Sequence, residues 1–226
     1  MGMASTDALC PTVPSLHALA EHVLAAGLHA ATGKIGLRAA PGGFATPESA
    51  DEALGGRWAV TGTEVRISGP DGSQRSVAIT TLRAAGGFFG IEPGMPDRVY
   101  TPVTPLDLDA VLPIDPAVAA TIGDWLALGQ EALTRLGATH PDDGPTAIQL
   151  WPEHFDLGST LGEINFGFSP GDDAISHPYA YVGPWTPKEG SFWNQPFGAT
   201  RTNGELTTVD QALAFFEEGR ALALPG

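Results

Sequence analysis

The chain has 226 residues, of which 42% are hydrophobic and 16% are charged, a balance that is typical of a globular protein and excludes disorder throughout. Its formal net charge is −15, with only two lysines, Lys34 and Lys188, so no basic stripe is available to displace counterions from a phosphate backbone. We therefore expect neither nucleic acid nor an anionic membrane surface as a partner.

No run of residues approaches the ~20 apolar positions of a membrane-spanning helix, and the first fifteen residues lack the basic start and apolar core of a signal peptide. The single cysteine, Cys10, has no partner for an internal disulfide. These features predict a cytoplasmic protein with a flexible leader over residues 1–14 and one compact domain over residues 15–226. Two subdomains, at about 15–105 and 115–226, are the alternative division.

The first half of the chain alternates between helical and strand patterns. Apolar residues at helical spacing after Pro14 predict a helix over 15–28 with Ser15 as its cap. The Asp71-Gly72 pair predicts a tight turn between two strands. The predicted strands are 33–38, 57–67 and 74–79, and a short helix is predicted within 80–90.

A proline-rich segment over 93–116 predicts an extended crossing without regular helix. Asp115 followed by Pro116 is typical of a helix start, and the helix is predicted to continue to about Leu136. Thr208 and Gln211 have the spacing of a capping box at the start of a last helix. The predicted strands of this half are 147–151, 163–168 and 178–182.

Because the strands occur in adjacent runs joined by short turns, the pattern favours an α+β fold with mainly antiparallel sheet and three longer helices. A faint echo between GKIGLRAAPGGF and GEINFGFSPGDD, each a strand before a Pro-Gly turn, suggests two sheets or a weak internal duplication.

The strand predicted over 163–168 alternates between two kinds of side chain. Ile164, Phe166 and Phe168 share one face, and the other face carries Asn165 and Gly167. Gly167 would leave an open notch for a ligand or another backbone. Tyr179 and Tyr181 share a face of the next strand. This polar face is predicted to line a pocket.

Two loops beside these strands combine histidine with carboxylates. The first contains Glu153, His154 and Asp156, and the second contains Asp172, Asp173 and His177. Such residues could bind a divalent metal through His154, Asp156 and His177, or perform acid–base chemistry through His154, Asp156, Asp173 and His177. No recognised ligand spacing is present, and turn acids with a loop-anchoring histidine are the alternative interpretation.

The first helix offers a rival group, His17, Glu21 and His22, which exceeds the inverted zincin pattern HxxEH by one residue. On an α-helical wheel His22 lies roughly 100° from Glu21, largely opposite the apolar stripe. The pattern therefore predicts a solvated or rim-facing helix surface.

Aromatic residues gather in the irregular segments around the second strand cluster. They could form a stacking wall for a flat or sugar-like ligand, or a satellite core beneath long loops. The favoured function is a small-molecule-binding protein with a pocket centred on 149–197. A small hydrolase or lyase, metal-assisted or using a His–carboxylate pair, is the alternative. The predicted ligand-binding residues are Trp151, Glu153, Asn165, Tyr179, Tyr181, Trp185, Trp193 and Asn194.

The stretches QLWPEHFDL, GFSPGDD, PYAYVGPW and FWNQPFGA, with TGKIGLRAAPGGFATP, resemble an uncharacterised bacterial family of unknown function over about residues 16–224. WPEHFD and GFSPGD are also similar to parts of a second uncharacterised bacterial family. The resemblance implies a single soluble folded protein and no particular activity.

Overall fold

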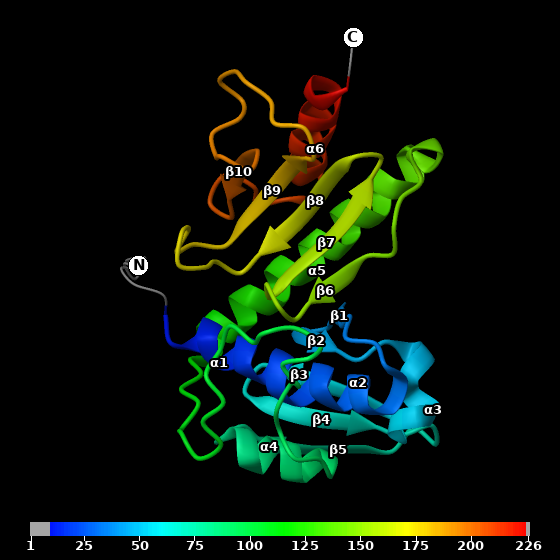
Figure 1. Ribbon diagram of the computed structural model, residues 1–226, viewed down its shortest axis with the longest axis vertical. Helices are drawn as coiled ribbons and strands as arrows, with labels where there is room; N and C mark the ends of the chain where they lie inside the picture. Colours follow the sequence, from blue (N-terminus) through cyan, green and yellow to red (C-terminus); the bar gives the residue numbers. More distant parts are fainter. Residues whose placement is uncertain (1–9, 225–226) are drawn as a thin grey trace.

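The structure is a computed structural model that describes residues 10–224, in which ten strands form two antiparallel five-stranded sheets. In each half of the chain a long helical segment precedes the sheet and another helix follows it (Figure 1). The predicted α+β class is confirmed, and both halves follow the order helix, five strands, helix, apart from short helical turns such as the one over 48–54. The sequence echo does not align equivalent strands, because it matches the first strand of one sheet with the third strand of the other.

The first half begins with a helical segment of 21 residues whose middle is a π-helix. The strand predicted over 57–67 is divided in two by a turn at Gly62, where φ is 55°. The hairpin at Asp71-Gly72 is confirmed. The elements are α1 (Thr12–Leu19), η1 (Ala20–Ala25), α2 (Ala26–Thr32), β1 (Arg38–Ala40), β2 (Gly43–Ala45), η2 (Glu48–Ala50), α3 (Asp51–Leu54), β3 (Arg57–Thr61), β4 (Glu64–Ser68), β5 (Gln74–Ala78) and α4 (Leu82–Phe89).

The second half has two strands that the sequence did not predict, β7 and β10. Both predicted helix caps are confirmed: Asp115 accepts hydrogen bonds from the amides of Ala117 and Val118, and Thr208 with Gln211 forms the capping box. The elements are α5 (Pro116–Thr139), η3 (Pro141–Asp143), β6 (Gln149–Trp151), β7 (Asp156–Leu161), β8 (Ile164–Ser169), β9 (Tyr179–Pro184), β10 (Ala199–Thr202) and α6 (Val209–Ala223).

The edges of the two sheets meet at one antiparallel bridge. Leu37 and Leu150 exchange backbone hydrogen bonds of 2.9 and 3.0 Å, and the Arg38 guanidinium donates to the carbonyl of Ile148. Helix α5 crosses this junction and packs on β1 and β2 of the first sheet and on β7 and β8 of the second. A single hydrophobic core therefore runs through both halves.

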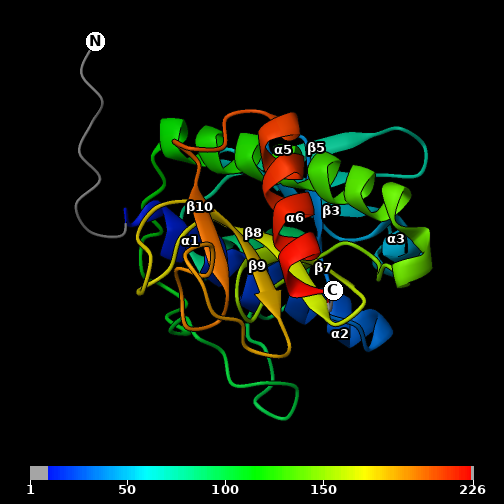
Figure 2. The same cartoon turned by 90° about the horizontal axis from the view of Figure 1, so that it is seen from above.

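The second sheet has one covered face and one open face. Helices α5 and α6 lie on the same side of it, and in Figure 1 α5 passes behind β7; Figure 2 shows α6 crossing α5. Phe168 contacts Trp125 of α5 and Phe216 of α6 at centroid distances of 4.9 and 5.5 Å, in edge-to-face geometry. The predicted core face of β8 is confirmed, because Ile164, Phe166 and Phe168 are all buried there.

The first helical segment begins at Thr12, three residues before the predicted cap, so residues 12–14 of the predicted flexible leader are part of this helix. Residues 1–9 of that leader lie outside the described residues. None of the described helices, including the 24-residue α5, is both long and apolar enough to cross a membrane.

The segment over residues 91–114, called the strap below, contains neither helix nor strand, as predicted. It is held against the first helical segment by hydrogen bonds. The amide of Gly94 donates to the carbonyl of His22, and the amides of Val103 and Thr104 donate to the Glu21 carboxylate. The strap thereby brings residues 103–105 beside the N-terminal turns of α1.

Candidate functional site

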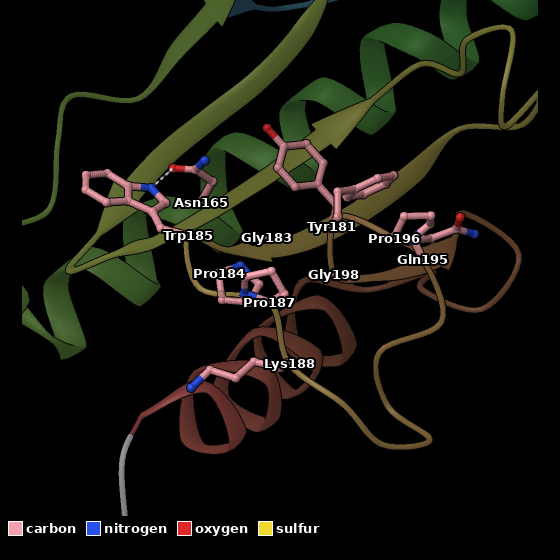
Figure 3. Close-up of a pocket in the computed structure, with 11 residues that line it drawn as sticks. Asn165, Tyr181, Gly183, Pro184, Trp185, Pro187, Lys188, Gln195, Pro196 and Gly198 are labelled. Carbon is pink, nitrogen blue, oxygen red and sulfur yellow. Dashed lines mark hydrogen bonds between the residues drawn. The ribbon is translucent and has the colours of Figure 1, made fainter.

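The open face of the second sheet carries the polar side chains that the alternation predicted. Asn165 of β8 and Tyr181 of β9 project from this face, with α5 on the other side of the sheet (Figure 3). Trp185 follows β9 and donates its indole N–H to Asn165 Oδ1 at 3.2 Å. The open face therefore carries aromatic rings and hydrogen-bonding groups rather than core residues.

Gly167 does not leave an open notch, because the protein's own Tyr181 occupies it. The two residues are register partners, and a Cβ at Gly167 would lie 2.5 Å from Tyr181 Cζ and Oη. The ring crosses β8, and its hydroxyl donates to Asp156 Oδ2 on β7 at 2.5 Å. The glycine thus allows a tyrosine on one strand to hold an aspartate two strands away.

A cavity of about 720 Å³ lies where this open face meets the first half of the chain. The α1 helix and the strap form one side of it, with apolar residues that include Val13 and Val103. The other side consists of the β6–β7 turn, the loop after β8 and strand β9. The polar lining residues are His17, Thr104, Glu153, His154, Asp156, Ser169, Asp172, Asp173, Tyr179 and Tyr181.

Two carboxylate oxygens in this lining are buried without a hydrogen-bond partner among residues 10–224, Asp156 Oδ1 and Glu153 Oε2. Both residues remain partly exposed as a whole, but these atoms are enclosed. Burial raises the pKa of the Asp156 carboxyl, and the charge of Glu153 acts in the same direction, whereas the Tyr181 hydrogen bond and His154 oppose the shift. Unsatisfied buried acceptors of this kind are costly to a folded protein.

Two tyrosine–aspartate pairs stand side by side on this wall. Tyr181 donates to Asp156, and Tyr179 donates to Asp172 Oδ2 at 2.6 Å, with ring centroids 6.4 Å apart. Burial, followed by the charge of the neighbouring aspartate, raises the pKa of Tyr181, and burial with the Asp172 hydrogen bond raises the pKa of Tyr179. Both phenols therefore stay protonated and act as donors to the two carboxylates.

The β6–β7 turn is fixed from the first half of the chain. Phe155 has φ of 52°, which makes it the single non-glycine residue with positive φ among residues 10–224. Its buried ring stacks on His17 of α1 with centroids 5.3 Å apart, and His17 Nε2 lies 2.7 Å from the carbonyl of Pro152. This anchoring fixes the position of a turn from which Glu153, His154 and Asp156 line the cavity.

Glu21 and His22 do not lie on a solvated or rim-facing helix surface, so the prediction was wrong for these two residues of the His17, Glu21 and His22 group. Glu21 and His22 are fully buried, at 0% and 1% exposure, inside the π-helical segment. His22 Nε2 lies 2.9 Å from the carbonyl of Thr104, and Glu21 also accepts the Thr104 hydroxyl at 2.5 Å. Glu21 and His22 fasten the strap, whereas His17 lines the cavity. Burial lowers the pKa of His17 despite the opposing charge of Glu21, which keeps the ring neutral near pH 7.

Most of the predicted ligand-binding residues line this cavity or one of two smaller cavities that adjoin it. One of about 570 Å³ is lined by Trp151, Glu153 and Asn165 among others, and one of about 370 Å³ by Asn165 and Trp185. Tyr181 lines all three cavities. Its side chain is therefore common to all three hollows on the open face.

Trp193 and Asn194 do not line these cavities. Trp193 packs against the core beside Phe192, at a centroid distance of 4.8 Å, which agrees with the satellite-core alternative for this aromatic cluster. Asn194 exchanges hydrogen bonds with the backbone of Thr200 and thereby fixes the loop that leads into β10. Both residues have structural contacts where a ligand contact was predicted.

Three of the four predicted acid–base residues, His154, Asp156 and Asp173, line the main cavity, whereas His177 does not. Asp172 has a turn role as well, because its Oδ1 accepts the amides of Ala174 and Ile175. Within residues 10–224 no group of three or more His, Cys, Asp or Glu side chains is arranged so that it could hold a metal ion. The predicted set of His154, Asp156 and His177 therefore does not form a metal centre in this structure.

Sequence reasoning did not identify the contribution of the first half to the site. His17, Val103 and Thr104 line the cavity although they lie far from 149–197 in sequence. Glu21 carried a usable signal. A carboxylate in an otherwise apolar helix needs hydrogen-bond partners from another segment if the helix is buried. Phe197, which stands edge-on to Tyr181 at 6.5 Å, belongs to the aromatic cluster for which the sequence left a stacking wall and a satellite core open.

No family model matches the chain, and neither a curated protein nor a solved structure is similar to it.

Proposed function

We propose that this protein binds a small organic molecule in the cavity between α1, the strap and the open face of the second sheet. The observation that carries the proposal is the pair of buried, unpartnered carboxylate oxygens, Asp156 Oδ1 and Glu153 Oε2, in two residues that line the cavity. Buried acceptors normally have partners, and a ligand with hydrogen-bond donors would supply them.

The dimensions and lining of the cavity support this proposal. Its volume of about 720 Å³ lies within the usual range for small-molecule sites, which are mostly apolar with a few convergent polar groups. Tyr179 and Tyr181 supply flat rings, and their hydroxyls are already committed to Asp172 and Asp156. The remaining free acceptors would then set the orientation of the ligand.

Acid–base catalysis in the same cavity is the second candidate, and the raised pKa of Asp156 favours it. An aspartic acid that keeps its proton at higher pH can serve as a general acid, and His154 lies close enough to influence its ionisation. If this candidate holds, the Asp156→Asn and His154→Ala variants retain ligand but lose turnover.

A variant that obstructs the cavity tests the binding proposal directly. Val103 is 67% exposed at the cavity wall on the strap, and Val103→Trp places a large ring there without removing a polar group. Val111→Trp is the matched control, because Val111 lies on the same strap, is 76% exposed and lines none of the three cavities.

The readout is a chemically diverse fragment set, screened by ligand-observed NMR and thermal shift on the wild-type protein. We expect hits that bind the wild-type protein and the Val111→Trp variant equally and lose at least tenfold in affinity for Val103→Trp. Hits that bind all three proteins equally, or a screen without hits, would refute the proposal.

A further inference from the structure

We infer that the ligand carries a positively charged nitrogen, as in a primary amine, an amidine or a guanidine, attached to an apolar body. This inference rests on the proposed function and specifies the chemistry of its ligand. The geometry behind it is the placement of two carboxylates with unpartnered, buried oxygens beside aromatic rings, in a cavity that no lysine or arginine of the described residues lines.

The charge of the lining is one-sided. Glu153, Asp156, Asp172 and Asp173 all line the cavity, and no lysine or arginine from residues 10–224 does so. Two histidines, His17 and His154, also line the cavity, and His17 is neutral near pH 7 because burial lowers its pKa. The field inside the cavity therefore favours a cation and opposes an anionic ligand.

The hydrogen bonds that the lining carboxylates can still accept narrow the chemical class of the ligand further. Tyr181 occupies one oxygen of Asp156, and Tyr179 with the turn amides occupies both oxygens of Asp172. Asp156 Oδ1 and Glu153 Oε2 remain, and ionised carboxylates only accept hydrogen bonds. An ammonium or guanidinium group offers several donors and a charge that offsets the mutual repulsion of these two acids.

Neighbouring rings and apolar residues fit the rest of such a molecule. Tyr181 and Phe197 stand edge-to-face on the cavity wall, where the face of an aromatic ring attracts a cation within about 6 Å. Val13, Val103 and Pro105 line the opposite side and suit an alkyl or aryl body. An arylalkylamine therefore matches the cavity in both charge and polarity.

The test uses three probes of similar size that differ in charge: phenethylamine, 2-phenylethanol and 3-phenylpropionate. Dissociation constants are measured by ligand-observed NMR and calorimetry at pH 7.5. We expect phenethylamine to bind at least tenfold more tightly than the alcohol and the carboxylate to bind most weakly. Asp156→Asn and Glu153→Gln are each expected to lower the affinity for the amine at least tenfold and to leave the alcohol within about twofold.

Glu189→Gln is the matched control, since Glu189 is an exposed carboxylate that lines none of the three cavities. It removes the same net charge and should change the amine affinity by less than twofold. An equal effect of Glu189→Gln and Asp156→Asn would show that attraction comes from the overall charge, and it would overturn the inference.

Failure of this inference is separable from failure of the proposed function. Should the alcohol or the carboxylate bind as tightly as the amine, with binding lost in Val103→Trp, the cavity binds small molecules but does not select cations. The same conclusion follows if all three probes fail while the fragment set yields other hits that Val103→Trp abolishes. If neither the probes nor the fragments bind, both proposals are refuted.

Discussion

Replacing Gly167 with alanine tests whether Tyr181 crosses β8 as the structure shows. The new methyl group would lie 2.5 Å from Tyr181 Cζ and Oη and 2.6 Å from Cε1, distances that van der Waals contact does not permit. The ring must move, and its hydrogen bond to Asp156 is lost with it. Asp156 would then have neither the tyrosine donor nor another partner for Oδ1.

The expected cost follows from these two losses. Overpacking of a filled site costs about 1–3 kcal/mol, and a hydrogen bond to a charged group contributes roughly 1.5–3 kcal/mol. Both losses arise from one displacement and do not add in full, so we expect a destabilisation of about 2–3 kcal/mol. At about 2–4 °C per kcal/mol for a chain of this size, the melting temperature should fall by roughly 4–12 °C.

The assay is urea and thermal unfolding followed by circular dichroism, with a second background that lacks the ring. In Tyr181→Ala protein the same Gly167→Ala change should cost little, because no side chain then occupies the position of the new methyl group. Gly87→Ala in α4 is the control: a Cβ there has no neighbour within 4 Å, and it should be neutral or stabilise by up to about 1 kcal/mol. Equal destabilisation of the wild-type and Tyr181→Ala proteins by Gly167→Ala would refute the reasoning.

Three further changes test other parts of the structure. Because the folded-state pKa of Asp156 is raised, the stability that its protonated form contributes is present at low pH and lost as pH rises through that pKa. Asp156→Asn should therefore raise the free energy of unfolding of the ligand-free protein by about 1 kcal/mol at pH 8, and with it the melting temperature. This stabilisation should shrink toward pH 4, and a stabilisation that is independent of pH would contradict the reasoning. Glu21→Gln should destabilise by about 1–3 kcal/mol and accelerate amide hydrogen exchange at Val103 and Thr104, since Glu21 accepts from both amides; unchanged exchange there would show that Glu21 does not hold the strap. Thr208→Ala should cost about 1 kcal/mol and fray the first turn of α6, which exchange measurements on that turn would detect or disprove.

Local signals predicted the elements that depend on local physics. Asp115 before Pro116, and Thr208 with Gln211, satisfy free amides at the starts of α5 and α6 and need no distant partner. The glycine of Asp71-Gly72 supplies the positive φ of the β4–β5 hairpin. For such features the residues that determine the structure lie within a few positions of one another.

Strand β7 could not be predicted because its side chains do not alternate. Its sequence, DLGSTL, mixes small and polar residues, and Gly158 lies on the open face beneath the Tyr181 hydroxyl rather than in a core. The strand is specified by its pairing with β6 and β8, which satisfies its backbone on both sides. The prediction of an open notch at Gly167 was wrong for a related reason. Tyr181, which fills that space, is its partner on the next strand and lies fourteen residues away in the sequence.

The error over His17, Glu21 and His22 has a geometric and an energetic origin. A wheel with 100° per residue does not describe a π-helix, in which hydrogen bonds join residues five apart and the rotation per residue is smaller. Their partners are also remote: Thr104 lies 82 positions after His22. A buried carboxylate is tolerable only with several donors, and a single sequence does not reveal which distant segment supplies them.

The repeated element order of the two halves does not give two equivalent sites. In the first sheet the positions of β3 that alternate with the buried Trp58 and Val60 carry Arg57, Ala59 and Thr61, whereas the open face of the second carries Tyr181 and Asn165. The main cavity exists only where α1 and the strap of the first half meet that second face. A ligand held there contacts both halves, so its binding free energy adds to the stability of their packing. Such a ligand should slow exchange in the strap and in β9 together, although the two segments lie in different halves of the chain.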